Sequence, residues 1–460
     1  MKTIFITITR GLIARNVLRN RLLEYLKNDK NLRVVIFVAS VAGRKLPDYF
    51  FDEFQSDNVI IEVISDKKIG KIRKIFQKAV AGLVYSPTTR LHAKYGSAKV
   101  KRKKIFTRIL HFLFYGPLGG LRCVKSLVRL VERMIFSDRE YRNYFERYKP
   151  NLVFSTSLLS NFDLAFLKEA RRRGVKTVCL PKSWDTMDKI LFRFEPDLFL
   201  VQYPGMLDDA VMWQGLKPHK VKIVGYPQFD IYNDKKVLKA RGEYCFKKGF
   251  DDKLPILFLG SEGLWSPNDA YIFRLIYDAR EHGLIPNCNL LIRPHFSQVN
   301  EPRYKNLNEK KNICIDDGYR RSNFFVDRWD PNREDMIDFA NSLHHCDLMI
   351  TFASTLVLDA VCFDKPLIAV SFGTRIEEIR GHKKDLSFVM YLQGFYRRVI
   401  DTGAITVVKS REELYSRIND YLKNPTLNHE KRKILLDKMC YEIDGRTGVR
   451  IYQFLMNSIK

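Results

Sequence analysis

The amino-acid sequence predicts an α/β protein made of two doubly wound halves. Short apolar runs rich in β-branched residues alternate with helix-like runs along most of the chain, which is typical of parallel sheets covered by helices. The alternation restarts after the polar, charged stretch 230–253, and 460 residues suffice for two or three domains of roughly 100–200 residues. Hydrophobic residues make up 46% and charged residues 28% of the chain, which excludes a disordered or low-complexity protein.

In the first half, the apolar run at 2–9 predicts a strand. The stretch 15–27 predicts a helix because Leu18, Leu22 and Leu26 recur at helical spacing. The first run stops at Arg10 without a cleavage site, so we expect no signal peptide, and no run of about 18 uncharged apolar residues predicts a membrane-spanning helix. The other strands of this half are predicted at 33–39, 59–64, 152–155, 176–180, 198–202 and 222–224, and the other helices at 158–173 and 206–213.

The second half repeats this pattern with short apolar runs and longer helical stretches. Its predicted strands span 255–259, 289–292, 347–351 and 366–370, and its predicted helices span 269–282, 336–346, 354–363 and 411–422. Two pairs of adjacent acids, Asp251-Asp252 and Asp316-Asp317, lie in polar turns. We expect these acids to be solvated, so they predict no metal site.

Residues 86–149 interrupt the alternation and form a basic helical insertion. The net charge of +27 falls almost wholly on residues 1–250, which contain 49 Lys and Arg against 23 Asp and Glu. Between Lys99 and Arg133, ten basic residues accompany one acid, Glu132, and apolar residues cover much of a helix at 105–115. Two interpretations of residues 99–136 stay open: contact with an anionic membrane surface, or helices packed on the sheet with a solvated basic face.

The eight cysteines lie at least sixteen residues apart, so the chain has no CxxC spacing for zinc or redox chemistry. Several lie in apolar runs, where a reduced cysteine packs as a small hydrophobe. This pattern favours a reducing compartment. We therefore expect a cytoplasmic protein, with peripheral attachment to the inner face of the cell membrane if the insertion contacts lipid.

In the first half, side chains suited to chemistry follow two predicted strands, and ligands of open α/β sheets bind at the carboxyl ends of strands. The stretch 181–189 offers a cation, a hydroxyl, an aromatic ring and a carboxylate. Asp185 is the candidate general base for an acceptor hydroxyl, although Ser183 and Asp185 also suit a helix cap. The candidates on the acceptor side or in the cleft are Arg10, Gly11, Arg15, Lys182, Ser183 and Trp184.

In the second half, residues suited to a diphosphate follow three predicted strands. Arginine matches phosphate oxygens with its planar fork, and His295, the second candidate catalytic residue, can donate a proton near neutral pH. A Ser-Thr helix start presents free N–H groups to an anion, and Asp359, one turn further on, is suited to ribose hydroxyls. The candidate donor-binding residues are Ser261, Glu262, Arg293, Ser354, Thr355 and Asp359.

Three elements of the second half resemble a known enzyme superfamily, the GT-B glycosyltransferases. The likeness is to their nucleotide-binding half, and in particular to the bacterial surface-polysaccharide branch that includes CDP-glycerol glycerophosphotransferase-like proteins. The elements are Arg293-Pro-His295, the pattern Asp347…Ser354-Thr355…Asp359…Lys365-Pro366, and the late Asp444-Gly445…Arg450-Ile451.

This resemblance implies two Rossmann-like domains that face each other across a cleft, with no metal or other cofactor. It implies an acceptor domain at 1–240 that includes the insertion, a nucleotide-donor domain at 241–440, and a last helix at 441–460 that packs back towards the first domain. The implied activity is transfer of a sugar from a nucleotide-activated donor to an anionic lipid-linked or polysaccharide acceptor of the cell envelope.

Two departures from the family and three alternative functions accompany this interpretation. The ribose-binding carboxylate is Glu in many GT-B enzymes but Asp359 here, and the His-Gly element of glycerophosphotransferases is absent, which favours sugar transfer. The alternatives are a CDP-polyol phosphotransferase, a nucleotide-sugar 2-epimerase, and a basic nucleic-acid-binding protein. The chain has no helix-turn-helix, zinc or RNP signature, so we expect no nucleic-acid partner.

Overall fold

The computed structural model describes residues 1–41, 44–65, 69–96, 103–296, 303–304, 307, 310–379 and 381–460. Its first sheet contains seven strands: β1 (Lys2–Ile8), β2 (Leu32–Ser40), β3 (Val59–Ser65), β4 (Leu152–Ser155), β5 (Lys176–Cys179), β6 (Leu198–Val201) and β7 (Val221–Ile223). They lie in the order β3-β2-β1-β4-β5-β6-β7, and every neighbouring pair is parallel.

The second sheet contains six strands: β8 (Ile256–Gly260), β9 (Asn289–Arg293), β10 (Ile313–Ile315), β11 (Leu348–Thr351), β12 (Leu367–Val370) and β15 (Thr406–Val408). Their order is β10-β9-β8-β11-β12-β15, again with parallel pairs throughout. A separate antiparallel hairpin joins β13 (Ile376–Ile379) to β14 (His382–Asp385).

Both sheets have the doubly wound strand order, so the prediction of two doubly wound halves is confirmed. The first strand of each, β1 or β8, lies in the middle and is buried along nearly its whole length. Such continuous apolar runs are expected where helices cover both faces of a parallel sheet. Strand order reverses between β1 and β4 and between β8 and β11, and ligands bind open α/β sheets at such points.

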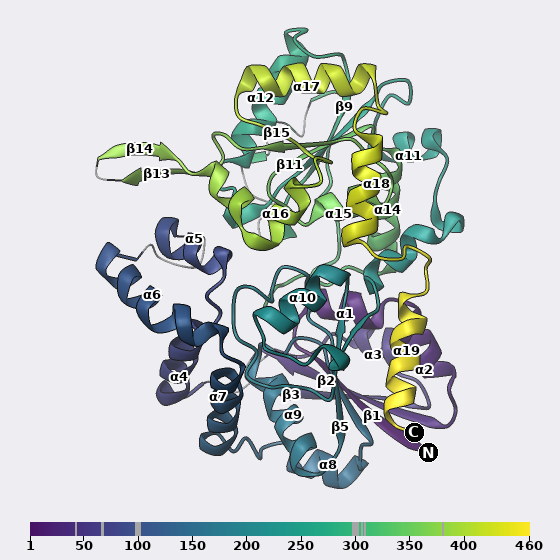
Figure 1. Ribbon diagram of the computed structural model, residues 1–460. Helices are drawn as coiled ribbons and strands as arrows, with labels where there is room; N and C mark the ends of the chain where they lie inside the picture. The colour runs from purple at the N-terminus through teal and green to yellow at the C-terminus, as the bar shows by residue number, and fades with distance from the viewer. Residues whose placement is uncertain are drawn as a thin grey trace.

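Helices cover both sheets and form the insertion (Figure 1). The first half contains α1 (Gly11–Leu18), α2 (Arg21–Asn28), α3 (Asp48–Phe54), α4 (Lys71–Ala81), α5 (Pro87–Tyr95), α6 (Ile105–Gly120), α7 (Arg122–Ile135), α8 (Arg142–Tyr148), α9 (Asn161–Arg172) and α10 (Pro204–Met212). The second half contains α11 (Arg241–Lys248), α12 (Asp269–Glu281), α14 (Arg333–His345), α15 (Leu356–Val361), α16 (Gly394–Ile400), α17 (Arg411–Lys423), α18 (His429–Met439) and α19 (Thr447–Ser458).

The single helix predicted at 15–27 is wrong, because the chain forms α1 and α2 there. The break lies at Arg19 and Asn20, and the Asn20 side chain accepts a hydrogen bond of 2.8 Å from the Leu22 N–H. Asparagine at this position caps the second helix and ends the first. Apolar spacing alone did not reveal the break, because each helix buries an apolar side with the same helical spacing.

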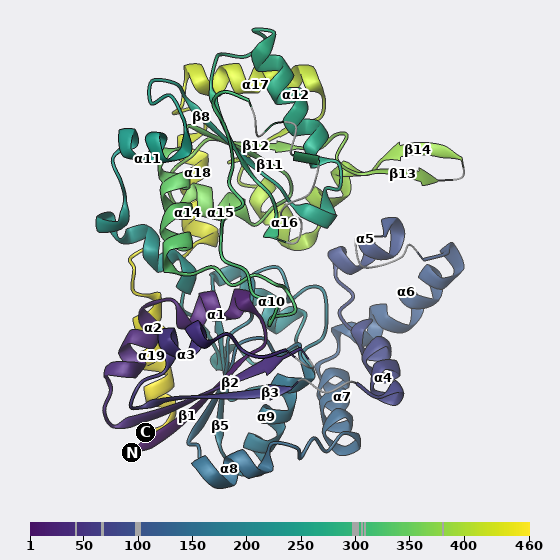
Figure 2. The same ribbon diagram turned by 180° about the vertical axis from the view of Figure 1, so that it is seen from behind.

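In the insertion, the helix expected at 105–115 continues to Gly120 and includes Pro117. A Cβ at Gly119 would lie 2.7 Å from the Leu83 carbonyl oxygen, so this glycine lets α6 approach residue 83 closely. Part of the basic run, residues 97–102, lies outside the described residues. Figures 1 and 2 both show α4, α6 and α7 along one side of the first domain, away from α19.

Helix α19, the last element of the second half, packs on the first sheet. Its residues Ile451 and Leu455 are fully buried in the cluster that contains the β1 side chains Ile4 and Ile6. The buried carboxylate of Asp230 accepts hydrogen bonds from the Thr447 and Gly448 N–H groups at 3.0 and 2.8 Å. These two bonds satisfy backbone donors at the start of α19 and hold this helix to the end of the first half.

Replacing Asp230 with alanine is expected to lower the free energy of unfolding by about 1–3 kcal/mol, because two buried N–H groups lose their partner. Urea denaturation of the whole chain measures the loss. Asp208→Ala, at an exposed position of α10, is the matched control and should leave stability unchanged. Equal stability of the Asp230 variant and this control would contradict the role of Asp230 in holding α19.

Candidate active site

A cavity of about 690 Å³ lies between the two sheets, and both halves of the chain contribute to its wall. Its lining follows the carboxyl ends of β1, β5, β8, β9 and β11, the edge at which doubly wound sheets bind ligands. The structure brings thirteen sequence candidates together here: Arg10, Arg15, Lys182, Ser183, Trp184, Asp185, Ser261, Glu262, Arg293, His295, Ser354, Thr355 and Asp359.

Gly11 is the sequence candidate that does not line the cavity. Its N–H donates to Asp327 Oδ1 at 3.1 Å, and a Cβ on it would lie 1.4 Å from the Trp329 carbonyl oxygen. This glycine therefore allows a loop of the second half to approach the start of α1. The approach places Asp327 and Trp329 in the cavity wall.

Arg293 ends β9 and is held firmly in the wall. Its guanidinium forms an ion pair with Asp316 and lies over the Phe339 ring, 4.4 Å from the ring centre. Asp316 is buried and also pairs with Lys248 at 2.9 Å, so the expectation that this acid is solvated is wrong. A buried partner fixes the cation before any ligand arrives.

The turn after β8 contains two side chains with different environments. The Ser261 hydroxyl donates to Asp269 and accepts the Gly263 N–H at 3.1 Å, so it shapes the turn. Glu262 Oε2 is buried and has no hydrogen-bond partner in the part of the chain that the structure describes. Burial raises the pKa of Glu262 well above its usual range, even though Lys189 lowers it. A raised pKa makes this carboxylate a stronger base than an ordinary glutamate once it is ionised.

His295 lies against the same turn. A Cβ at Gly263, where φ is +64°, would lie 2.8 Å from His295 Nδ1, so the glycine makes room for the imidazole. The neighbouring Phe296 ring lies 4.1 Å from the imidazole and stacks on Trp329 at 5.1 Å. The imidazole is therefore positioned beside the residue that follows Glu262.

Asp359 lies one turn into α15 and takes a hydrogen bond of 2.6 Å from the Tyr232 hydroxyl. Burial raises the pKa of Asp359 to about 6. Arg15, from α1 of the first half, interacts electrostatically with Asp359 and with Arg293. The structure thus brings Arg15, expected on the acceptor side, towards the residues expected to bind the donor.

The loop at 181–189 forms turns and begins no helix, so the alternative of a helix cap at 183–185 is wrong. The Trp184 ring is buried edge-on against Phe395, with ring centres 5.2 Å apart, so it packs the two halves together. Burial alone would raise the pKa of Asp185, but its ion pair with Lys189 holds that pKa well below the usual range. A carboxylate this weakly basic is poorly suited to removing a proton.

Sequence reasoning missed several residues of the wall. His92, from α5 of the insertion, lies within 3.2 Å of Gln393 Oε1 and stacks on Trp265. Burial lowers its pKa to about 4, so this imidazole is neutral at pH 7. A lone histidine in an insertion carries no motif that could have predicted this position. Among the described residues, no three His, Cys, Asp or Glu side chains gather in a way that could hold a metal ion.

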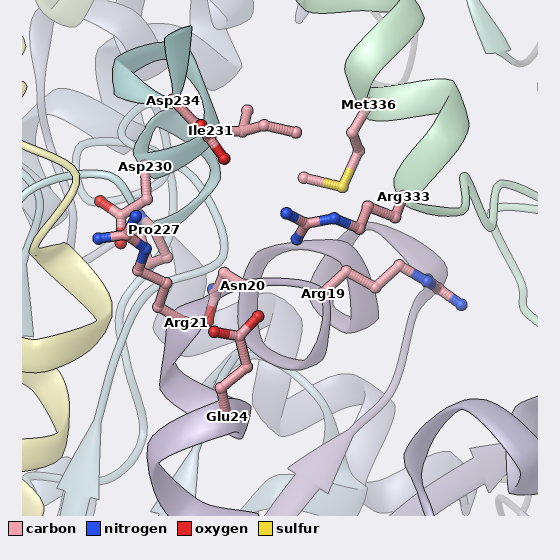
Figure 3. A pocket seen from close by; sticks show the side chains of 10 residues that line it. All are labelled: Arg19, Asn20, Arg21, Glu24, Pro227, Asp230, Ile231, Asp234, Arg333 and Met336. Carbon is pink, nitrogen blue, oxygen red and sulfur yellow. The ribbon is translucent and has the colours of Figure 1, made fainter. Parts of the chain in front are cut away.

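A second, smaller cavity of about 140 Å³ lies where the α1–α2 turn meets the segment Pro227–Asn233 and helix α14 (Figure 3). None of the sequence candidates for the site lines it. Arg19, in its wall, pairs with Glu53 and Asp330 at 2.7 Å, and Asp230 is bonded to α19. These side chains serve the junction of the two halves.

No family model matches the sequence, and no curated protein matches it. Solved structures match along nearly the whole chain. UDP-GlcNAc 2-epimerase from Neisseria meningitidis bound to UDP-GlcNAc has a TM-score of 0.55 at 11% identity, covering 99% of this chain and 100% of that one. A glycosyltransferase from Rickettsia africae has a TM-score of 0.51 at 11% identity, with coverages of 99% and 98%.

The wall teichoic acid polymerase TagF, soaked with CDP-glycerol, has a TM-score of 0.52 at 11% identity, covering 100% of this chain and 88% of that one. At such identities the likeness shows the fold alone. The chain has the GT-B fold, and the expected fold class is confirmed.

Proposed function

We propose that the protein is a glycosyltransferase that moves a sugar from a nucleotide-activated donor to an anionic acceptor of the bacterial cell envelope. The observation that carries this proposal is the chemistry of the cavity wall. A nucleoside diphosphate needs fixed cations for its phosphates, and sugar transfer needs a group that takes a proton. The wall supplies a carboxyl of raised pKa, Glu262, and five cations: Arg10, Arg15, Lys182, Lys189 and Arg293.

In this proposal the donor lies against the second half. Arg293, held by Asp316, binds the diphosphate together with the backbone at Ser354 and Thr355. Asp359, whose carboxylate already accepts the Tyr232 hydroxyl, binds the ribose hydroxyls. Ser261 has its hydroxyl engaged by Asp269 and Gly263, so we give it the role of shaping the turn rather than of binding phosphate.

The reaction exchanges one bond at the anomeric carbon for another. The acceptor oxygen bonds to this carbon, and the bond to the diphosphate oxygen breaks with its electron pair leaving on the nucleoside diphosphate. Glu262 takes the acceptor proton, a role we move from Asp185 because the ion pair with Lys189 weakens that carboxylate as a base. Arg293 and His295 stabilise the negative charge that develops on the leaving group.

The acceptor lies against the first half in this proposal. Arg10, Lys182 and Lys189 give that side of the cavity a positive charge, which suits an acceptor with phosphate groups, such as a lipid-linked diphosphate. Such an acceptor is held in a membrane, so we propose that the enzyme works at the inner face of the cell membrane.

Nucleotide binding is the first test. Addition of the correct nucleoside diphosphate at about 100 times its Kd is expected to stabilise the protein by about 2.7 kcal/mol, which raises the melting temperature by several degrees. UDP, GDP, CDP, dTDP and CMP are compared by thermal shift, with each variant referred to its own unliganded melting temperature. Arg293→Ala should lose the shift because the diphosphate loses its fixed cation.

The matched control is Arg274→Ala, which removes an exposed arginine of α12 that contacts Asp278 and the Tyr277 ring and does not line the cavity. It should keep the full shift. A shift with CDP alone would favour the polyol-phosphate alternative. No shift with any nucleotide would contradict the proposal.

A nucleotide-sugar 2-epimerase is a second candidate, because several solved structures of this fold are named UDP-GlcNAc 2-epimerases. Inversion at C2 breaks and remakes a bond at that carbon. An epimerase that removes the C2 proton therefore takes up deuterium from heavy water at C2, even when UDP-GlcNAc is the only substrate present. A transferase without its acceptor leaves C2 unlabelled. Mass spectrometry of the recovered nucleotide sugar therefore separates the two candidates.

A further inference from the structure

The helical insertion and the preceding helix α4 expose many large apolar side chains to solvent. Thirteen large apolar side chains on α4, α6 and α7, and at the junction of α6 and α7, are each at least 40% exposed, and we call them the insertion patch. They are Ile72, Ile75, Ile105, Phe106, Ile109, Phe112, Leu113, Leu118, Leu121, Leu127, Leu130, Met134 and Ile135. So many exposed apolar side chains on neighbouring helices are typical of a site where another molecule or a membrane docks.

Helix α7 has the reverse of the usual arrangement, because its charged side faces the protein. Lys125, Arg129 and Glu132 are buried, with Arg129 donating to the Phe192 and Gln214 carbonyl oxygens at 3.0 and 2.7 Å. Leu127 and Met134, on the other side, are 59% and 73% exposed. The buried charges fix the orientation of the helix, so its apolar side cannot turn inward to join the core.

The charge around the patch selects the partner. Between Lys67 and Phe136 the sequence contains eighteen lysines and arginines and a single acid, Glu132, which is buried and paired with Lys168. The exposed basic residues among them, at both ends of α4 and beside α6 and α7, include Lys71, Lys74, Lys78, Lys104, Arg122 and Arg133. An apolar face bordered by cations is complementary to an anionic lipid surface.

We propose that the insertion patch docks on the surface of a bilayer that contains anionic phospholipids. The apolar side chains of α6 and α7 enter the boundary between headgroups and acyl chains, and the flanking lysines and arginines contact lipid phosphates. The helices lie in the plane of the interface. Within the ranges that the structure describes, no helix combines the length and apolarity needed to cross a bilayer.

The patch adjoins the candidate active site through α5. His92 of this helix lines the cavity, and its Thr88 accepts the Gly394 N–H of the second half at 2.8 Å. In both views the β13–β14 hairpin projects to the same side as α5 and α6 (Figures 1 and 2). Docking would therefore bring the cavity close to the membrane. That the cavity then receives an acceptor held in the membrane rests on the proposed function, whereas docking itself does not.

Vesicle flotation of the full-length protein without nucleotide tests the proposal. We expect binding to vesicles of phosphatidylcholine with phosphatidylglycerol, little binding to phosphatidylcholine alone, and weaker binding at high salt. The double variant Phe106→Ser/Phe112→Ser should bind about tenfold or more weakly, since two apolar side chains no longer enter the interface. Both positions are more than half exposed, so the fold should be preserved.

Phe246→Ser is the matched control, because Phe246 is 89% exposed and its helix, α11, lies on the opposite side of the molecule in both views. It should bind vesicles as the unmodified protein does. Equal binding by the double variant and this control would overturn the proposal. Two other results would also overturn the proposal. One is no vesicle binding but salt-sensitive binding to duplex DNA; the other is no vesicle binding but self-association that the double variant abolishes. Nucleotide shifts, measured separately, report on the proposed function alone.

Discussion

Replacing Glu262 with glutamine is expected to lower kcat of sugar transfer about 10²–10⁴-fold, the range by which a positioned acid–base group accelerates a reaction. Glutamine keeps the size and shape of the side chain but cannot take a proton. The nucleotide Kd should stay unchanged, because the proposed donor contacts are made by Arg293 and Asp359. The rate at which the transfer reaction releases nucleoside diphosphate measures kcat, with a donor that carries the nucleotide identified by thermal shift.

The pH dependence gives this prediction a second readout. Only the ionised carboxylate can take a proton, and burial raises the pKa of Glu262, so kcat of the unmodified enzyme should rise with pH until that pKa is passed. The glutamine variant should lose this rise. An equal loss of kcat in Asp185→Asn, with Glu262→Gln fully active, would return the role of base to Asp185.

Stability separates a catalytic role of Glu262 from a structural one. Its pKa is higher in the folded protein than in the unfolded chain, so the folded state binds the proton more tightly. Stability of the unmodified protein therefore falls as pH rises from the usual glutamate value of 4.5 towards the raised pKa, and glutamine lacks this loss. We expect Glu262→Gln to melt at the same or a higher temperature than the unmodified protein at pH 8. Glu281→Gln, at an exposed position of α12, is the control for both readouts.

The largest stability effect is expected from Glu132→Ala, which should lower the free energy of unfolding by about 3–5 kcal/mol, as is typical when a buried ion pair loses one partner. The fully buried Glu132 carboxylate pairs with Lys168 at 3.0 Å, Arg193 at 3.1 Å and Arg73 at 2.9 Å. Its removal leaves these cations with fewer partners in a poorly solvated place. The melting temperature should fall by about 10 °C for a domain of this size.

Two variants control for this effect. Glu146→Ala removes a solvent-exposed glutamate that pairs with Arg142 and Arg173, and it should leave the melting temperature unchanged. Arg193→Met in the Glu132→Ala background should recover part of the loss, because the buried Arg193 forms its ion pair within the described residues with Glu132 alone. A Glu132→Ala protein as stable as the Glu146→Ala protein would contradict the assigned charge cluster.

This charge cluster also shows how far sequence pattern reached in the insertion. The basic pattern at 99–136 left open helices packed on the sheet with a solvated basic face, and α7 lies in this range. It could not reveal which side of the helix faces the protein, because the usual assumption buries the apolar side. Glu132 faces inward, where it meets Lys168 of α9 and Arg193 of the loop before β6.

The candidate site shows the same division. Residues after the strand ends, such as Arg293 and Asp359, could be selected from sequence because doubly wound sheets bind ligands at that edge. The environment of each side chain could not. The ion pair with Lys189 makes Asp185 a weak base, and burial makes Glu262 a stronger one. Gly11 allows a close contact with Trp329, which lies 318 positions along the printed sequence.

The sequence by itself determined the two doubly wound halves, because local alternation of apolar runs and helical periods reflects which face of each element is buried. It also determined which loops carry cations and carboxylates. Only the tertiary structure decided which of these side chains share a cavity, which pKa values are raised or lowered, and that α7 exposes its apolar side. Those properties depend on desolvation and on charges brought together from distant parts of the chain, and a linear pattern does not record such neighbours.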